Sequence, residues 1–550
     1  MYKKDYEIKM NDIIRDMCTY RRLKRDPTTA LQNKNNKFVD VLYKMNIVDF
    51  NEKNKLLTNT SIAPRIYGLP KIHKEGVPLR PICSSINSPT YGLSKYIVDI
   101  LKHLTKDSKY NIKDAVDFKS KINNVKIEKD ETLISFDVVS LFPSIPINLA
   151  LKTIAEKWNI IKDYTKIPKE LFIEILTLCI KDSRYFVYQD KVYEQRKGLP
   201  MGSPASPIIA DVVMEVLLDV SVEKMMTKPR LLSKYVDDIF CIIKKTEIEN
   251  TLKILNTFDK NIQFTHEVEE DGKLPYLDSI IIRHDNNLKL DWYQKPTASG
   301  RLINFFSKHP RRVKINTATN FIHRIFNISD QQFHQNNELK IRNILTKNDF
   351  PQKTIDGLIK RVKENTNVKI TEGKEISYKS LTYIPGFSER FCRSNAYNKD
   401  KYQLALKTNY SVNNMFSRTK TKTKKEDKSN VVYKIACNGD ETNICQKVYI
   451  GTTKTKLKTR LSGHKSDQKS DKPLEQKTAL AAHCTLTGHR PNFKDINIMA
   501  QENNYKRRFT LEMLHIINVP PEKRMNFKTD TDHCAHIYRN LVHKHRWKKT

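Results

Sequence analysis

Two adjacent aspartates, Asp237 and Asp238, stand between two short apolar segments and constrain the fold more than any other feature of this chain. One segment ends in Tyr235-Val236, and the other covers residues 239–243. This pattern predicts a β-hairpin with the acidic pair at its turn. Carboxylates at a hairpin tip stay ionised and hold hard cations such as Mg²⁺ through oxygen. The alternative is a solvated Asp-Asp turn without function.

A third carboxylate, Asp137, lies within the apolar segment 132–142. An acid in such a strand is costly to bury unless it is paired or bound to a metal. Together with Asp237 and Asp238, it predicts a cluster for two Mg²⁺ ions, which clamp the attacking and leaving oxygens of an in-line phosphoryl displacement. Between them lies a loop rich in Gly and Pro, residues 198–207, whose backbone can approach a ligand closely.

The order of these motifs resembles motifs A, B and C of the reverse transcriptase palm, and further segments narrow the resemblance to the reverse transcriptases of Penelope-like retroelements, relatives of telomerase. The resemblance covers roughly residues 1–410. It implies a right-hand polymerase of mixed α/β (α+β) class with fingers, palm and thumb. The segments that carry the resemblance to Penelope-like reverse transcriptases are RIYGLPKIHK at 65–74, VPLRPI at 77–82, LPYLD at 274–278 and YQKPT at 293–297.

The resemblance implies a role for each matching position. Phe142 follows the first aspartate of the cluster at the place where a ring excludes a ribose 2′-OH; a plain core residue is the alternative. Arg80 suits bidentate contact with a triphosphate and Lys71 acts as a point charge, unless both are ordinary surface residues. The implied Mg²⁺ ligands are Asp137, Asp237 and Asp238, and the implied dNTP-binding residues are Lys71, Arg80, Phe142, Met201 and Gly202.

The charge of the chain favours a polyanionic partner. Lys and Arg number 98 against 62 Asp and Glu, which leaves a net charge of +36, and such residues release counterions from phosphates. A generic basic protein and a protein of anionic membranes are the alternatives. No apolar segment of about 18 residues and no signal pattern is visible, which argues against the membrane. Nine irregularly spaced cysteines predict an intracellular chain with reduced thiols.

From residue 431 the sequence changes character. Two short strands are predicted, at 431–435 and 448–453, and Glu512 lies later in a helix-like segment, 508–515. Leu457, Arg460, Leu461 and His464 share one helical face. This part resembles a GIY-YIG endonuclease domain, with a first motif that lacks Gly and has Val432 in the middle place. The implied catalytic residues are Tyr433, Tyr449, Arg460, His464 and Glu512.

The resemblance implies hydrolysis with one divalent ion. Glu512 would hold that ion, Arg460 would neutralise charge on the scissile phosphate, and a tyrosine with His464 would activate water. Plain DNA contact by a basic helix face is the alternative for Arg460 and His464, and an ordinary exposed acid is the alternative for Glu512.

Four further residues are candidates for a structural Zn²⁺ site. His483 and His489 have the H-x5-H spacing known from zinc sites, whereas Cys437 and Cys445 are spaced more widely than in zinc fingers. Penelope-type endonucleases carry a CCHH set in this region, so the resemblance supports zinc. Cys484, beside His483, is an alternative ligand.

The predicted domains are 1–110 (N-terminal helical part and fingers), 111–290 (palm), 291–415 (thumb), 416–430 (basic linker) and 431–550 (endonuclease). The linker has nuclear import and nucleic-acid tethering as alternative roles. Strands are predicted at 132–139, 185–188, 239–243 and 276–282, and helices at 149–158, 171–180, 208–220 and over much of 300–380.

These features predict an RNA-directed DNA polymerase with a DNA-nicking domain that together perform target-primed reverse transcription. RNA template, DNA primer and target, and dNTPs are the expected partners, and the nucleus is the expected location. One alternative is a domesticated, telomerase-like polymerase with an inactive nuclease. A truncated, catalytically dead nucleic-acid-binding relic is another, because relatives carry a longer N-terminal extension. An RNA-templated RNA polymerase is disfavoured by Phe142.

Overall fold

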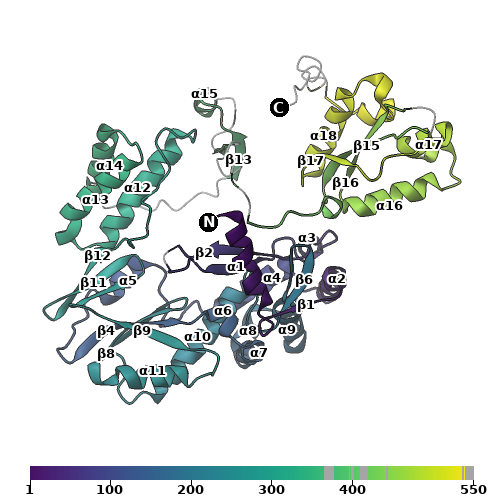
Figure 1. Cartoon of the computed structure of the whole chain (residues 1–550). Coiled ribbons are helices and arrows are strands. Elements are labelled where there is room, and N and C mark those ends of the chain that lie inside the picture. The colour runs from purple at the N-terminus through teal and green to yellow at the C-terminus, as the bar shows by residue number, and fades with distance from the viewer. Residues whose placement is uncertain are drawn as a thin grey trace. The chain divides into compact units, whose positions relative to one another are not determined.

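The computed structural model describes residues 1–72, 74–364, 377–394, 397, 402–408, 416, 419–440, 444–535 and 538 (Figure 1). None of the helices in these ranges has both the length and the apolar character that a bilayer crossing needs. The chain divides into two compact units. The first comprises Met1–Arg25, Arg65–Ser85 and Tyr91–Thr419, and the second comprises Asp26–Pro64, Ile86–Thr90 and Lys420–Thr550.

A four-stranded antiparallel sheet in the first unit carries the three predicted carboxylates. Its strands, in spatial order, are β7 (Leu231–Tyr235), β8 (Asp238–Lys244), β4 (Glu131–Val138) and β9 (Phe264–Val268). Most residues of β4 and β8 are buried; the exceptions are Ser135 and Asp137 in β4, and Asp238 and Lys244 in β8. This explains why these strands are continuous apolar runs and not alternating ones. The predicted hairpin and the predicted strands at 132–139 and 239–243 are confirmed.

One face of this sheet packs against a smaller antiparallel sheet and one helix. These elements are β10 (Lys273–Tyr276), β11 (Ser279–His284), β12 (Asn287–Trp292) and α5 (Ala115–Ile122). Phe240 of β8, Phe118 of α5 and Tyr276 of β10 meet in the shared core. The single strand predicted over 276–282 is wrong, because Leu277 and Asp278 form a two-residue turn between β10 and β11.

Helices of the first unit pack around α10 (Ala205–Lys224). Buried side chains occur along its whole length, including Ile209, Val213 and Leu217. The helix predicted at 208–220 is therefore confirmed and extends further at both ends. Its neighbours are α4 (Tyr91–Leu101), α6 (Leu141–Ser144), α7 (Ile147–Glu156) and α11 (Ile248–Asn256), with α8 (Trp158–Ile161) and α9 (Lys169–Thr177) beside α7.

A second large sheet has five strands drawn from distant parts of the sequence. In spatial order they are β1 (Tyr20–Arg22), β6 (Lys191–Gln195), β5 (Tyr185–Tyr188), β2 (Arg65–Pro70) and β3 (Leu79–Ser84). Helix α1 (Lys3–Arg15) packs on it through Met10 and Ile14, which join Ile66 and Phe186 in one core. Strands β5 and β6, which the sequence-based division assigns to the palm, thus complete the sheet of the predicted fingers.

Three helices after β12 form a bundle with its own apolar core, and Figure 1 shows them side by side. They are α12 (Arg311–Ile328), α13 (His334–Lys347) and α14 (Gln352–Glu364). Trp292 of β12 reaches this core. Arg324 of α12 forms an ion pair with Asp278 in the β10–β11 turn, and Lys119 of α5 pairs with Asp330 at 3.2 Å. The bundle is therefore joined to the smaller sheet by both packing and charge.

The helical content predicted over 300–380 is confirmed as far as Glu364. Residues 365–376 lie outside the described residues. Beyond them, β13 (Ser377–Thr382) and β14 (Tyr402–Lys407) pair in parallel, with α15 (Phe387–Arg393) between them in sequence. Most of the predicted linker is described, but residues 417 and 418 are not, and a short 3₁₀ turn covers Lys425–Asp427.

The C-terminal part of the second unit is a three-stranded antiparallel sheet with a core on each face. Tyr433 faces one core with Leu457 and Leu480. Val432, its neighbour in sequence, faces the other core with Ile516. The strands in spatial order are β16 (Val448–Thr453), β15 (Val431–Ala436) and β17 (Asn497–Gln501), and the helices are α16 (Leu457–Gln468), α17 (Ala479–Thr487) and α18 (Tyr505–Asn518).

The second unit also contains a helix pair from the N-terminal region, α2 (Thr28–Lys44) and α3 (Phe50–Leu56). Helix α2 begins at Thr28, directly after Asp26-Pro27. The Asp26 carboxylate accepts a hydrogen bond from the Thr28 backbone N–H at 2.8 Å, which satisfies a donor at this helix start.

Candidate active sites

The structure brings Asp137, Asp237 and Asp238 together at one end of the four-stranded sheet. Asp137 pairs directly with Asp238 across β4 and β8, and Asp237 lies in the turn just before Asp238. Val236, the first residue of that turn, has φ 59°, a left-handed conformation that is rare for a β-branched residue. The hairpin therefore holds the carboxylates at a strained tip.

Burial and mutual repulsion disfavour the charged forms of these carboxylates. Burial raises the pKa of Asp238 to about 7, and Asp137 and Asp237 add to the shift. Burial, followed by Asp237, also raises the pKa of Asp137. Anionic groups held so close favour a bound cation, and their oxygens are the donors that Mg²⁺ prefers. The residues present therefore fit a Mg²⁺ site.

Two lysines that the sequence reasoning did not single out also act on this cluster. Lys295 lowers the pKa of Asp238, and Lys74 lowers the pKa of Asp137, although burial and the neighbouring carboxylates outweigh both. A signal for them existed, because both lie in the motifs that carry the family resemblance, at 293–297 and 65–74. They add positive charge where an anionic substrate would approach.

The loop at 198–207 is anchored to β3 through its backbone. The Cys83 N–H donates to the Met201 carbonyl at 3.0 Å, and the Ser85 hydroxyl donates to the Gly202 carbonyl at 2.6 Å. Gly202 has φ 99°, and a Cβ at this position would lie 2.0 Å from the Cys83 carbonyl oxygen. Only glycine fits there.

We expect Gly202→Ala to lower polymerase activity by more than about tenfold, because the added Cβ forces the loop away from β3 at a strain cost of about 1–3 kcal/mol. Single-nucleotide incorporation on a primed template measures the effect. Gly357→Ala is the matched control: it adds the same methyl group within α14, where a Cβ would meet no atom within 4 Å. Equal activity of the two variants would contradict the role given to the loop.

The predicted dNTP-binding residues lie on the elements that border this loop. Phe142 is half-buried in α6, unlike its core neighbour Leu141, and its carbonyl accepts from the Leu199 N–H at 2.8 Å. Arg80 is exposed on β3, and the Lys71 N–H donates to the Pro78 carbonyl at 2.8 Å where the β2–β3 hairpin continues. His73 of the same predicted motif lies outside the described residues.

The C-terminal domain gathers its predicted residues at a second site. The Tyr433 hydroxyl lies 2.7 Å from Nε2 of His464, and Nε of Arg460 donates to the Tyr433 oxygen at 3.2 Å. The Tyr449 ring packs edge-on against His464 at 5.3 Å. Gly451 lies opposite Tyr433, and a Cβ there would approach the Tyr433 hydroxyl to 2.7 Å. The glycine therefore makes room for both tyrosines.

Burial sets the protonation states at this site. Burial, with Arg460, lowers the pKa of His464 to about 4, so its ring is neutral and Nε2 can accept the Tyr433 proton. Burial raises the pKa of Tyr433 to about 12. Burial, followed by Asp530, raises the pKa of Glu512 to about 7, and a Thr452 N–H and Arg460 oppose the rise. Glu512 thus lies within electrostatic reach of the tyrosine cluster and is not an ordinary exposed acid.

Cys437, Cys445, His483 and His489 also come together, with their ligand atoms all within 4.8 Å of one another. Nε2 of His483 lies 3.4 Å from the Cys437 sulfur and 3.8 Å from the Cys445 sulfur. Nδ1 of His489 is buried and has no hydrogen-bond partner among the described residues. Two thiols and two imidazoles are a donor set for tetrahedral Zn²⁺, so these residues fit the metal. Cys484 instead accepts a hydrogen bond from Gln468 at 3.3 Å.

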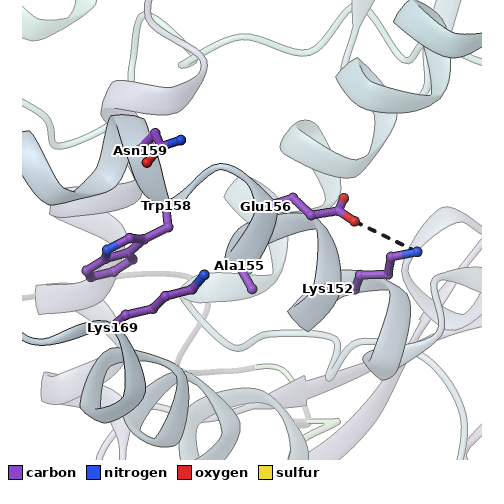
Figure 2. A pocket seen from close by; sticks show the side chains of 6 residues that line it. All are labelled: Lys152, Ala155, Glu156, Trp158, Asn159 and Lys169. Carbon is purple, nitrogen blue, oxygen red and sulfur yellow. Dashed lines mark ion pairs between the residues drawn. The ribbon is translucent and has the colours of Figure 1, made fainter.

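A separate pocket of about 300 Å³ lies on α7, α8 and the start of α9 (Figure 2). Lys152 and Glu156 form an ion pair at 3.8 Å on one side of it. Figure 2 shows the side chains of Trp158 and Lys169 on the other side. No predicted site residue lines this pocket, so it adds nothing to either site.

Comparison with known families identifies two segments of the chain. Residues 72–268 match the family described as "Reverse transcriptase (RNA-dependent DNA polymerase)", and this range contains all three clustered carboxylates and Gly202. Residues 301–360 match the "Animal helix-turn-helix domain", which the sequence reasoning missed. Helical periodicity was visible there, but periodicity alone does not separate this domain from a thumb. No curated protein matches the chain.

Solved polymerase structures resemble the chain at low sequence identity. The telomerase from Candida albicans, solved with a fragment of telomeric RNA, is 13% identical with a TM-score of 0.42, and the match covers 65% of this chain and 59% of that one. The apo telomerase from Candida tropicalis is 12% identical, with a TM-score of 0.34 and coverage of 64% and 65%. The Sicinivirus RNA-dependent RNA polymerase is 11% identical, with a TM-score of 0.34 and coverage of 60% and 71%.

Proposed function

We propose that this chain, which contains a reverse transcriptase domain and thus an RNA-directed DNA polymerase, is the polymerase of a Penelope-like retroelement. Its C-terminal domain nicks DNA as a GIY-YIG endonuclease, and its palm extends the exposed 3′-hydroxyl by copying RNA. The observation that carries the polymerase role is the cluster of Asp137, Asp237 and Asp238 within the matched residues.

In the polymerase site the three carboxylates would hold the metal. When bound, two Mg²⁺ ions would favour ionisation of the primer 3′-hydroxyl and offset the charge that develops on the phosphates. Lys71 and Arg80 bind the triphosphate of the incoming nucleotide, and Phe142 excludes a ribose 2′-OH. Lys74 and Lys295 favour the approach of anionic substrate, since both lie within electrostatic reach of the carboxylates.

In the nuclease site a proton moves along a hydrogen-bonded chain. Arg460 donates to the Tyr433 oxygen, which leaves the phenol proton directed at Nε2 of neutral His464. Water gives a proton to the Tyr433 oxygen as the phenol passes its own proton to His464, and the resulting hydroxide attacks phosphorus. The bond from phosphorus to the 3′-oxygen breaks, that oxygen takes up a proton from solvent, and His464 returns its proton to solvent. Arg460 also offsets charge on the scissile phosphate. Glu512 would hold one divalent ion, which stabilises the leaving oxygen when bound.

The partners follow from these activities. RNA serves as template, DNA as primer and target, and dNTPs as substrates, and the net charge of +36 supports binding to these polyanions. A nuclear location is part of the same proposal, because target DNA in a nucleated cell lies there.

The proposal is tested with supercoiled plasmid, an RNA template, labelled dNTPs and Mg²⁺ in one reaction. We expect labelled DNA covalently joined to nicked plasmid. Glu512→Gln should lose nicking and joining while it still extends a supplied primer, and Asp237→Asn should nick but not extend. A folded wild-type protein that extends primers without nicking would refute the nuclease role and favour a domesticated polymerase. Loss of both activities would favour a nucleic-acid-binding relic.

We further propose that Cys437, Cys445, His483 and His489 hold a structural Zn²⁺ ion. Metal binding would engage two thiols, one buried (Cys437) and one half-buried (Cys445), and it would give the buried Nδ1 of His489 a partner. The site would lock the β15–β16 connection to α17, which carries His483.

We expect purified protein to contain about one zinc per chain and Cys437→Ser to contain almost none. Removal of the ion should lower the melting temperature of the C-terminal domain, because the binding energy of a structural zinc contributes to folding. Metal analysis with thermal unfolding makes the measurement. Cys484→Ser is the matched control and should keep its zinc; zinc loss in that variant alone would reassign the ligand.

A further inference from the structure

The segment at 274–278, which helped to identify the family, forms a tight turn against the polymerase site. Tyr276 ends β10, and its hydroxyl donates to the backbone carbonyl of Asp238 at 3.1 Å. Its side chain is 2% exposed, and its ring packs against Phe118 at 4.8 Å and Phe240 at 5.5 Å. The two aromatic contacts hold the ring in place, and the hydrogen bond joins its hydroxyl to the backbone of Asp238, which completes the carboxylate cluster.

The turn between β7 and β8 and the turn between β10 and β11 have the same backbone geometry. In one, Tyr235 pairs with Asp238 around a two-residue loop that begins with Val236 at φ 59°. In the other, Tyr276 pairs with Ser279 around a two-residue loop that begins with Leu277 at φ 55°. Left-handed backbone at a branched side chain costs about 1–3 kcal/mol and persists only where the surroundings enforce it.

Two contacts hold the strained turn between β10 and β11 in place. The Ser279 hydroxyl donates to the Tyr276 carbonyl at 2.9 Å, and Leu277 packs against the core shared with the large sheet. The tight turn thus fixes the end of β10 in place. A looser connection would leave the ring packed but let its hydroxyl drift from the Asp238 carbonyl.

We propose that Tyr276 is a positioning residue of the polymerase: its hydroxyl fixes the backbone of Asp238 and thereby the direction of that carboxylate toward the metal. The hydrogen bond acts on the closing residue of the strained catalytic hairpin, where a small backbone rotation moves the carboxylate most. The inference rests on the proposed metal-binding role of Asp238. It gives Tyr276 no contact with substrate and no part in proton transfer.

Tyr276→Phe tests this, because it removes one oxygen and keeps the aromatic packing. We expect kcat for dNTP incorporation to fall by about tenfold. The Mg²⁺ concentration for half-maximal activity, and the dissociation constant for Mg²⁺ measured by calorimetry without substrate, should both rise several-fold, as for other groups that orient a metal ligand. KM for the primer–template should not change. Tyr188→Phe, which removes a hydroxyl from a buried tyrosine in the five-stranded sheet (6% exposed), is the control and should behave as wild type.

A double mutant separates positioning from general stability. In an Asp238→Asn background, which keeps the carbonyl but weakens the metal ligand, Tyr276→Phe should cost little further activity. An equal loss in both backgrounds would overturn the inference, as would unchanged kcat and Mg²⁺ dependence in Tyr276→Phe alone. An inactive but folded wild-type protein would instead overturn the proposed function, and the inference with it.

Discussion

Asp137→Asn is expected to lower RNA-templated DNA synthesis by about a thousandfold or more, which corresponds to a rise of about 4 kcal/mol in the barrier. Asp137 pairs directly with Asp238 and is the only carboxylate of the cluster on β4. Asparagine keeps the size and the strand pairing but removes the negative charge that holds a cation. Primer extension under single-turnover conditions measures the loss.

The control for this variant is a carboxylate elsewhere on the same sheet. Glu267 lies on β9 and weakly raises the pKa of both Asp137 and Asp238, so Glu267→Gln removes a nearby charge without removing a proposed ligand. We expect Glu267→Gln to keep activity within a few-fold of wild type. Nicking should survive in Asp137→Asn. An Asp137→Asn protein that extends primers at the wild-type rate would refute the assignment of this site.

Arg460→Ala is expected to lower DNA nicking by about a hundredfold to a thousandfold, as the loss of one charge-stabilising donor does in other hydrolytic sites. The side chain donates to the Tyr433 oxygen and lies near Glu512, so its removal disturbs both the proton chain and the charge balance. Conversion of supercoiled plasmid to open circles measures the rate. Primer extension by the same protein should remain unchanged.

The expected effect of Arg460→Ala comes from the contact of Arg460 with Tyr433 and not from its charge alone. A second cation on the same helix separates the two explanations. Lys458 of α16 pairs with Asp427 at 2.8 Å, and Lys458→Ala removes one positive charge without touching the tyrosine cluster. If Arg460 merely attracts DNA, both variants should nick equally slowly and bind DNA equally weakly. If Arg460 acts in the reaction, only its variant should lose nicking while DNA affinity stays close to wild type.

The carboxylate hairpin was predictable because its signal is local. Apolar runs on both sides of Asp237 and Asp238 specify two strands and a tight turn, and the run around Asp137 specifies a partner strand. The left-handed φ of Val236 could not be predicted from the sequence, because φ at a turn depends on how the strands on either side pair, here Tyr235 with Asp238.

The parts that escaped prediction depend on long-range packing. A strand over 276–282 was expected from apolar continuity, yet the turn at Leu277 divides it, since no Gly or Asn marks that turn. Lys74 and Lys295 act on the carboxylates from segments far away in sequence. The helix-turn-helix match at 301–360 was missed because an apolar period of 3.6 residues does not specify how three helices pack.

The first motif of the proposed nuclease departs from the GIY pattern at two positions, which lie on opposite faces of β15. Val432, which occupies its middle place, faces the core of Ile450 and Ile516 on the opposite side of the sheet from Tyr433. Val431, which stands where the motif has Gly, lies in the same core as Tyr433, so alternation along β15 puts this departure on the face of the tyrosine cluster. Tyr433 and Gly451, which lie opposite each other across β15 and β16, retain the residue types that the resemblance requires.

The polymerase assignment is tested by Mg²⁺-dependent incorporation of dNTPs by the wild-type chain on an RNA template with a DNA primer. An Asp237→Asn/Asp238→Asn protein with the same melting temperature serves as its control. We expect template-directed DNA synthesis that depends on Mg²⁺, discriminates against ribonucleotides and disappears in the double variant. Absence of synthesis by the folded wild-type protein, or equal synthesis by the double variant, would contradict it.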